Sequence, residues 1–415
     1  MRNHSQRAAL SEEMHVRRLP RFTAPCRLVQ IVTVMGEGAA EAARRHIETL
    51  AERAQVVVPI AAKYAVLAWD DVTLVWERHT EFATYTLIRS STFDLPFDPA
   101  HFAPHLDAIL ADMPGEVVRA TQVALMDGGA DALPPNDDAA WFTTEATVIC
   151  DVAGGDARIA SDFRLHPDGY GRLLVADRGL TGDEFAQVVQ RLQELGNYRN
   201  MALLGLPVAQ RLTPAVSALE TRLAELTKAI AARTSEDDRL LDELTFLSAE
   251  LARMMAETRY RMSATRAYAQ LAMDRLSALQ VRPLRGHQTL ADFTERRLIP
   301  AVRTCDSFSA RLEDLSQRAA WTSELLRTRI DIALAKQNRD LLTSMDRRTD
   351  LQLRLQQTVE GLSIVAISYY LVSLIGYAAG AFHGVSHELA MAVAVPVVLV
   401  GVTLAMLRVR RRLHD

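Results

Sequence analysis

The sequence predicts an α+β protein with a membrane anchor: a mixed α/β cytoplasmic domain, then a long helical stalk, then a C-terminal two-helix transmembrane hairpin. Three observations predict this order. Short β-branched runs separated by turn residues fill the first 180 residues or so. Helical periodicity dominates the middle of the chain. Two long uncharged apolar runs lie near its end.

These composition changes divide the chain into four segments. We expect an α/β domain at 1–180, a helical hairpin and stalk at 181–358, a transmembrane hairpin at 359–407 and a basic cytoplasmic tail at 408–415.

Composition excludes several classes of protein. The 415 residues include 47 Lys and Arg and 51 Asp and Glu, which gives a formal net charge of −4. The chain therefore has no overall positive charge that would favour nucleic acid as a partner. The three cysteines are odd in number and far apart, which argues against a disulfide framework and a thiolate zinc site. The first 21 residues carry no apolar signal segment, so we expect the bulk of the chain to stay in the cytoplasm.

Strands and one helix are predicted in the first domain. Residues 39–53 have helical spacing of their apolar side chains. Residues 72–88 read as two strands joined near 78–82. The other apolar, β-branched runs predict strands at 26–34, 117–126, 143–152, 158–165 and 171–175.

Long helices are predicted from residue 181 onward. Thr181, Ser235 and Thr289 are each followed three residues later by an acid, the arrangement of a capping box. Apolar residues then recur at steps of three and four along 240–279 and again from Val302 to Met345. If 301–382 is one helix, it is about 120 Å long and enters the bilayer directly.

Two uncharged runs predict the transmembrane hairpin. Residues 361–382 and 389–407 would span roughly 33 and 28 Å as helices, close to the hydrocarbon thickness of a membrane. Only six residues, 383–388, separate them, so both ends lie on one side. Arginines flank the hairpin and none lies in its turn, which places both termini in the cytoplasm.

Small residues follow one face of the first span. Gly376, Gly380 and Gly384 repeat at four-residue spacing, and Ser373 and Tyr377 lie on nearby turns. Small residues at this spacing let helices approach closely. They therefore predict an oligomer interface or a pore lining, or else the packing of the two spans within one subunit.

One polar cluster stands out in the first domain. Glu77, His79 and Glu81 would share one face of a strand, because side chains alternate. Such a set suits a divalent cation or acid–base work, and a solvated strand face with cross-strand charge pairs is the alternative. A divalent cation is the one cofactor that the sequence suggests.

Several stretches along the chain are distinctive: RAAL at 7–10, EMHVR at 13–17, WERHTEF at 76–82, YRNMALLGLP at 198–207, ATRAY at 264–268, ERRLIPA at 295–301, QN at 337–338 and QQTVEGLSIVAISYY at 356–370. On these stretches the sequence resembles a bacterial family of predicted membrane-anchored proteins, domain of unknown function 3422. The resemblance covers essentially the whole chain and implies an inner-membrane protein without an established activity.

The predicted architecture also resembles that of the CorA-type magnesium channels. The resemblance implies a homo-oligomer whose first span lines a pore. The Gly-Met-Asn motif that ends the first span of those channels is absent, and the equivalent stretch here is 376–384.

Two hypotheses for function follow. The first is a membrane protein with a cytoplasmic sensor-like domain that assembles into a CorA-like oligomer and conducts or regulates ions. The second is a membrane-anchored interaction scaffold without transport activity. None of the common nucleotide-binding, hydrolase or metalloprotease motifs occurs, so no enzyme is predicted.

Overall fold

The computed structural model of the chain describes residues 3–7, 10–11, 18–36, 39–59, 62–128, 141–143, 147–232, 236–379 and 387–414. The chain divides into two compact units, Met1–Trp321 and Thr322–Asp415. The prediction of four segments uses other boundaries and stays a prediction.

A nine-stranded sheet forms the centre of the first unit. Its order is β2-β3-β4-β1-β5-β8-β7-β6-β9, and every described pairing is antiparallel except β5 with β8. The strands are β1 Cys26–Val34, β2 Tyr64–Trp69, β3 Val72–Arg78, β4 Phe82–Ser90, β5 Glu116–Asp127, β6 Val148–Val152, β7 Ala157–Ser161, β8 Gly171–Asp177 and β9 Arg282–Pro283.

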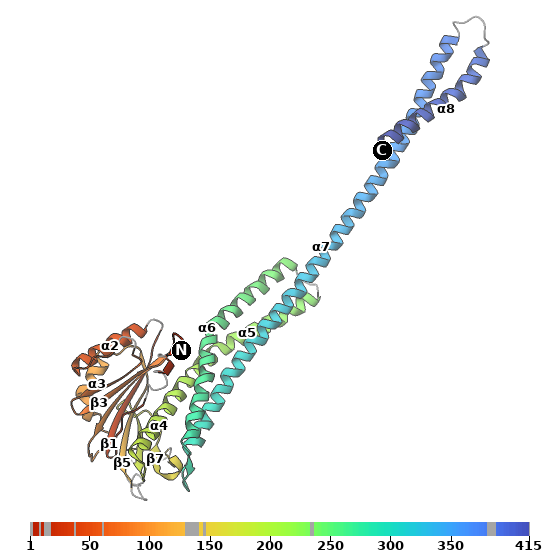
Figure 1. Ribbon diagram of the computed structural model, residues 1–415. Coiled ribbons are helices and arrows are strands. Elements are labelled where there is room, and N and C mark those ends of the chain that lie inside the picture. Colours follow the sequence, from red (N-terminus) through yellow and green to blue (C-terminus); the bar gives the residue numbers. More distant parts are fainter. Residues whose placement is uncertain are drawn as a thin grey trace. The chain divides into compact units, whose positions relative to one another are not determined.

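Helices cover both faces of this sheet (Figure 1). Helices α2 and α3 lie on one face and α4 and α6 on the other, so the first unit has a layered α/β/α arrangement. The helices are α2 Ala39–Arg53, α3 Ala103–Leu110, α4 Gly182–Leu203, α5 Gly205–Ala232, α6 Asp237–Ala278, α7 Leu290–Ala379 and α8 His387–His414.

The alternation of side chains along β1 separates two hydrophobic cores. Cys26, Leu28 and Val32 belong to a core shared with α4 and α6. Val29 and Ile31 point to the opposite face and pack with α2 and α3. The sheet is therefore buried on both faces where β1 passes through it, which explains the continuous apolar run in this strand.

The mixed α/β class of this domain is confirmed, and so are most of its elements. The predicted bounds of β1 and α2 agree with the structure, and residues 72–88 do form the hairpin of β3 and β4. The strand expected at 143–152 begins only at Val148. Strand β2 and helix α3 were not predicted, since β2 is short and prolines flank the start of α3.

Helix starts follow two of the three predicted caps. The Thr181 backbone N–H and hydroxyl both donate to Glu184 at the start of α4 (3.0 and 2.8 Å). At the start of α7 the Thr289 hydroxyl donates to Asp292 (2.7 Å) and accepts from the Asp292 backbone N–H (3.0 Å). Helix α6 begins at Asp237 with Glu236 as its N-cap, and Ser235 lies outside the described residues.

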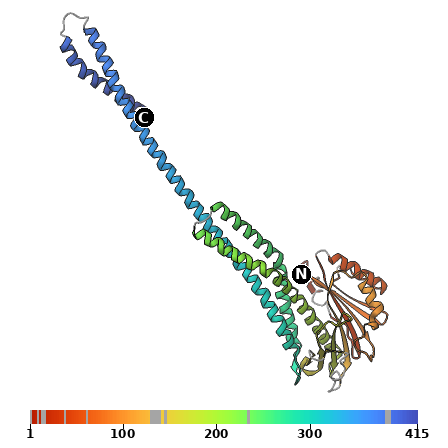
Figure 2. The same ribbon diagram turned by 180° about the vertical axis from the view of Figure 1, so that it is seen from behind.

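Helices α5, α6 and the first part of α7 run side by side in the first unit (Figure 2). Ion pairs join them: Arg311 of α7 to Glu220 of α5 (2.8 Å), and Arg266 of α6 to Asp306 of α7 (2.8 Å). The predicted seam of α6 is buried along its length, from Leu240 to Leu279.

The predicted seam of α7 is buried only in part. It is buried from Cys305 through Leu312, Leu315 and Leu326. Farther along, Leu334, Leu341 and Met345 are 52%, 55% and 60% exposed. A packed stalk as far as Met345 stays a prediction, because among the described residues no segment of the same chain covers the later turns.

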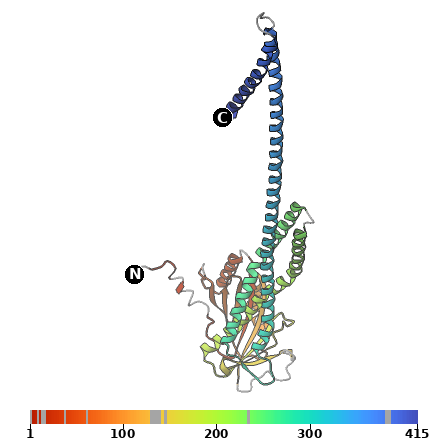
Figure 3. The same ribbon diagram turned by 90° about the vertical axis from the view of Figure 1, so that its right-hand side faces the viewer.

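The second unit contains the rest of α7 together with α8, which turns back from the end of α7 and diverges from it (Figure 3). Both helices are long and apolar enough to cross a membrane. Only 11% of the apolar window in α7 and 0% of the window in α8 are buried. The two spans therefore do not cover each other in the manner of a soluble helical core.

Candidate functional site

The three residues of the predicted metal cluster do not share one strand face. Glu77 lies on β3, whereas His79 and Glu81 lie in the connection to β4. His79 Nε2 is 3.5 Å from the Glu77 carboxylate, but Glu81 forms an ion pair with Arg261 of α6. Within the described ranges no group of three or more His, Cys, Asp or Glu side chains is placed to hold a metal ion.

The predicted small-residue face of the first span is described only in part. Ser373, Gly376 and Tyr377 lie on α7, where Gly376 is buried, Ser373 is half-buried and Tyr377 is 83% exposed. Gly380 and Gly384 lie outside the described residues. Their role as an interface or pore lining stays a prediction.

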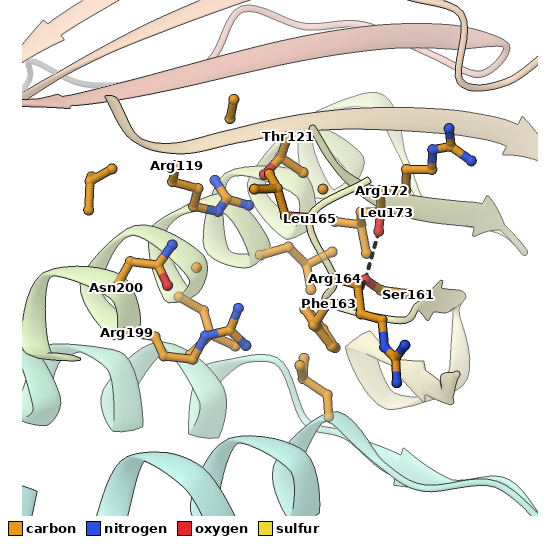
Figure 4. A pocket seen from close by; sticks show the side chains of 17 residues that line it. Arg119, Thr121, Ser161, Phe163, Arg164, Leu165, Arg172, Leu173, Arg199 and Asn200 are labelled. Carbon is orange, nitrogen blue, oxygen red and sulfur yellow. Dashed lines mark hydrogen bonds between the residues drawn. The ribbon is translucent and has the colours of Figure 1, made fainter. Parts of the chain in front are cut away.

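A cavity of about 260 Å³ lies between the sheet and α4 in the first unit (Figure 4). Arg119 and Thr121 of β5 line it on the sheet side, and Arg199 and Asn200 line it on the α4 side. Its apolar lining includes five leucines: Leu165, Leu173, Leu192, Leu195 and Leu290. The side chains of Arg119 and Arg199 extend into the same space from opposite walls.

Arg119 is held by neutral partners. Its Nη1 donates to the side-chain oxygens of Gln30 (2.9 Å), Gln193 (2.7 Å) and Asn197 (2.9 Å). Gln30 is oriented for this contact because its own amide donates to Thr86 (3.0 Å). No carboxylate of the described chain pairs with Arg119, and its Nε and Nη2 have no partner there.

Gly196 of α4 makes room for the Arg119 guanidinium. A Cβ at position 196 would lie 2.8 Å from Cζ, Nε and Nη2 of Arg119. Glycine inside a helix costs about 1 kcal/mol relative to alanine, so this position has a steric reason for it. The guanidinium lies directly against the backbone of α4.

Arg199 is held by aromatic rings. Its Cζ lies 4.8 Å from the centre of the Phe163 ring and 5.5 Å from that of Phe293. Such cation–π contacts orient a guanidinium but leave its charge without a counter-charge. In the part of the chain that the structure describes, no acid forms an ion pair with Arg199.

The surroundings disfavour both positive charges. Burial, and then the nearby charge of Arg199, lower the pKa of Arg119 to about 9. Burial alone lowers the pKa of Arg199 to about 10. Both groups remain protonated at neutral pH, so the cavity contains two cations whose charge the described protein does not balance.

The other two arginines that line the cavity point away from it (Figure 4). Arg164 is exposed, and Arg172 packs over the ring of Phe97 (5.5 Å) and pairs with Asp168 (3.3 Å). The positive charge of the cavity therefore comes from Arg119 and Arg199.

The sequence alone does not reveal this site, although two of its residues stand out in their local patterns. Arg119 is a cation inside an otherwise apolar strand run, and Gly196 interrupts a strong helical pattern. Neither signal indicates a partner, because Arg119 and Gly196 are far apart in sequence. Only the docking of α4 on β5 brings them together.

The sequence matches the family described as "Protein of unknown function (DUF3422)" over residues 2–413. The chain belongs to this family. The match confirms the resemblance found from its motifs, and the DUF3422 description assigns no activity. It lends no support to the likeness with CorA-type channels. No curated protein matches the sequence significantly.

Proposed function

We propose that this DUF3422 protein is a sensor anchored in the bacterial inner membrane by a C-terminal hairpin, with its α/β domain in the cytoplasm. The observation that carries the membrane anchor is the exposure of apolar side chains in the second unit. The large apolar side chains of Leu362, Val365 and Leu374 are 70%, 66% and 63% exposed. Apolar surface of this extent is unfavourable in water at about 25 cal/mol per Å², whereas lipid accommodates it.

The backbone of the second unit also suits a bilayer. Both apolar segments are helical wherever the structure describes them, so their backbone groups are satisfied internally. The flanking basic residues support cytoplasmic termini: Arg347, Arg348 and Arg354 precede the first span, and Arg408, Arg410 and Arg411 follow the second.

Reporter fusions test the topology. Fusions at Met1 and Asp415 should report the cytoplasm, and an insertion at Gly384 should report the outside. A reporter signal from outside the cytoplasm at Met1 would refute the proposal.

We propose further that the protein assembles with copies of itself. The exposed side chains of Leu334, Leu341 and Met345 follow each other at steps of seven and four on α7. This spacing places them on one helix face, as in coiled-coil seams. A second copy of the chain would cover these side chains, whereas the bilayer would cover the apolar spans that follow.

Ion conduction separates the two functional hypotheses. A channel-like assembly should support ion flux in proteoliposomes, whereas a scaffold anchored by the same hairpin should not. Oligomer size measured in the same preparation shows whether the assembly was intact. We propose neither catalysis nor nucleic-acid binding for the chain.

A further inference from the structure

Two half-buried guanidinium groups line one cavity, and neither has a carboxylate partner among the described residues. Isolated charges are costly to bury, so a cation in such a place is normally paired. Arg119 and Arg199 instead rest on neutral amides and aromatic rings. A bound anion would supply the charge that the described protein lacks.

We propose that this cavity binds a small organic dianion, with its oxyanion head between Arg119 and Arg199 and a short apolar body against the leucine wall. The proposal deepens the sensor role proposed above and rests on it for its biological meaning. Binding itself is measurable whether or not the chain spans a membrane.

The guanidinium of Arg119 is prepared for such a head group. Three amide oxygens hold Nη1 in place, and Gly196 lets the group lie flat on α4, so that Nε and Nη2 remain without a protein partner. This pair of parallel donors is the edge with which arginine grips phosphate and carboxylate in two-point contacts. The fixed geometry reduces the entropy lost on binding.

The remaining walls select charge and size. Asn200 and Thr121 add a side-chain amide and a hydroxyl beside the two cations. Leu165, Leu173 and Leu192 offer apolar surface that a bare inorganic ion would leave uncovered. A volume of about 260 Å³ suits a small metabolite.

Calorimetric titration of the full-length protein in detergent tests the proposal. The probes share one ring: phenyl phosphate has two negative charges near neutral pH, benzoate one, and phenol none. We expect saturable binding in the order phenyl phosphate, benzoate, phenol. Absence of saturable phenyl phosphate binding up to about 10 mM would overturn the proposal.

Variants locate the binding. Arg119→Gln and Arg199→Gln should each weaken phenyl phosphate about tenfold or more, the effect of losing a hydrogen bond to a charged group. Arg211→Gln removes the same charge from an exposed position on α5 and should leave the affinity unchanged. Equal losses in all three variants would indicate a general charge effect and refute the site.

Gly196→Ala tests the geometry without changing charge. The new methyl group must displace the Arg119 guanidinium, so affinity should fall even though both cations remain. Gly182→Ala, at the start of the same helix, meets only Thr23 at 3.9 Å and is the matched control. If Arg119→Gln fails to fold, the comparison of Gly196→Ala with Gly182→Ala tests the site by itself. Unchanged affinity for phenyl phosphate in Gly196→Ala would then contradict the proposal.

A lipid head group is the other source of a phosphate monoester. In nanodiscs that contain phosphatidic acid, phenyl phosphate should bind as well as in nanodiscs of phosphatidylcholine alone. Loss of binding there would assign the site to a membrane lipid and refute a soluble ligand. Neither outcome depends on the reporter fusions, so failure of the topology and failure of the site are distinguishable.

Discussion

At the scale of single residues, two helical glycines occupy positions that a methyl group cannot share. Gly196 leaves space for Arg119, and Gly205, at the start of α5, leaves space for Thr265 of α6. A Cβ at position 205 would lie 2.2 Å from Thr265 Oγ1 and 3.4 Å from Cys305 Sγ. Three helices therefore meet at Gly205.

Gly205→Ala should destabilise the first unit by about 1–3 kcal/mol, the usual cost of overpacking a core. Thermal unfolding of the full-length protein in detergent measures the effect. Thr265→Ala removes the hydroxyl that the new methyl group meets, so the double variant should lose less than the sum of the two single variants. Strict additivity would show that this contact is not the cause.

His46 of α2 gives a pH dependence. Burial lowers its pKa below the usual value, against a smaller opposite effect of the Ile109 carbonyl. Well above pH 6.5 the histidine is neutral in both the folded and the unfolded state, so its lowered pKa does not reduce the free energy of unfolding there. As the pH falls below that value, the unfolded chain takes up the proton more readily and stability decreases.

We therefore expect the melting temperature to fall between about pH 7.5 and pH 5, and to fall less in His46→Gln. Glutamine keeps a hydrogen-bonding group near the Tyr85 hydroxyl, which His46 Nδ1 contacts at 3.0 Å. An identical fall in both proteins would assign the pH dependence to other groups.

At the scale of elements, local sequence signals place most strands and helices correctly. The bounds of β1 follow from its apolar, β-branched run and those of α2 from helical periodicity. The starts of α4 and α7 follow from their capping residues. Misses occur where tertiary contacts decide. Strand β9 has two residues and exists because it pairs with β6.

The cap of α4 can be tested directly. Thr181→Ala removes a hydroxyl that takes part in the capping box, and we expect a loss of about 0.5–2 kcal/mol in thermal unfolding. Thr221→Ala in α5 removes a hydroxyl that only donates back to the Ser217 carbonyl in the same helix, so it should change stability little. Equal effects would contradict a special role for the cap.

At the scale of the whole molecule, the apolar surface of the second unit is the feature that needs partners. Leu312, Leu315 and Leu326 are buried in the chain itself and are unavailable for assembly. In the assembly that we propose, the exposed residues from Leu334 onward would supply contacts between subunits.

If the protein assembles as proposed, Gly376→Leu and Gly380→Leu should reduce the oligomer in detergent while the α/β domain stays folded. Leucine adds bulk where backbones approach closely, and overpacking costs about 1–3 kcal/mol at each copy of the contact. Light scattering measures the assembly, and Gly361→Leu, where a Cβ meets nothing within 4 Å, is the control. An unchanged oligomer in both variants would leave the seam at Leu334, Leu341 and Met345 as the candidate interface.

Periodicity, caps and uninterrupted apolar length are properties of short stretches, and for this reason the sequence alone predicts the α/β class, the long helices and two segments able to span a membrane. Proximity between distant residues is a different property. Arg119 lies against Gly196 and shares a cavity with Arg199 only because α4 docks on β5. Glu81 forms an ion pair with Arg261, and not with His79, because α6 packs beside the β3–β4 hairpin. Such contacts depend on the packing of whole elements, so only the tertiary structure decides where the charge without a partner lies.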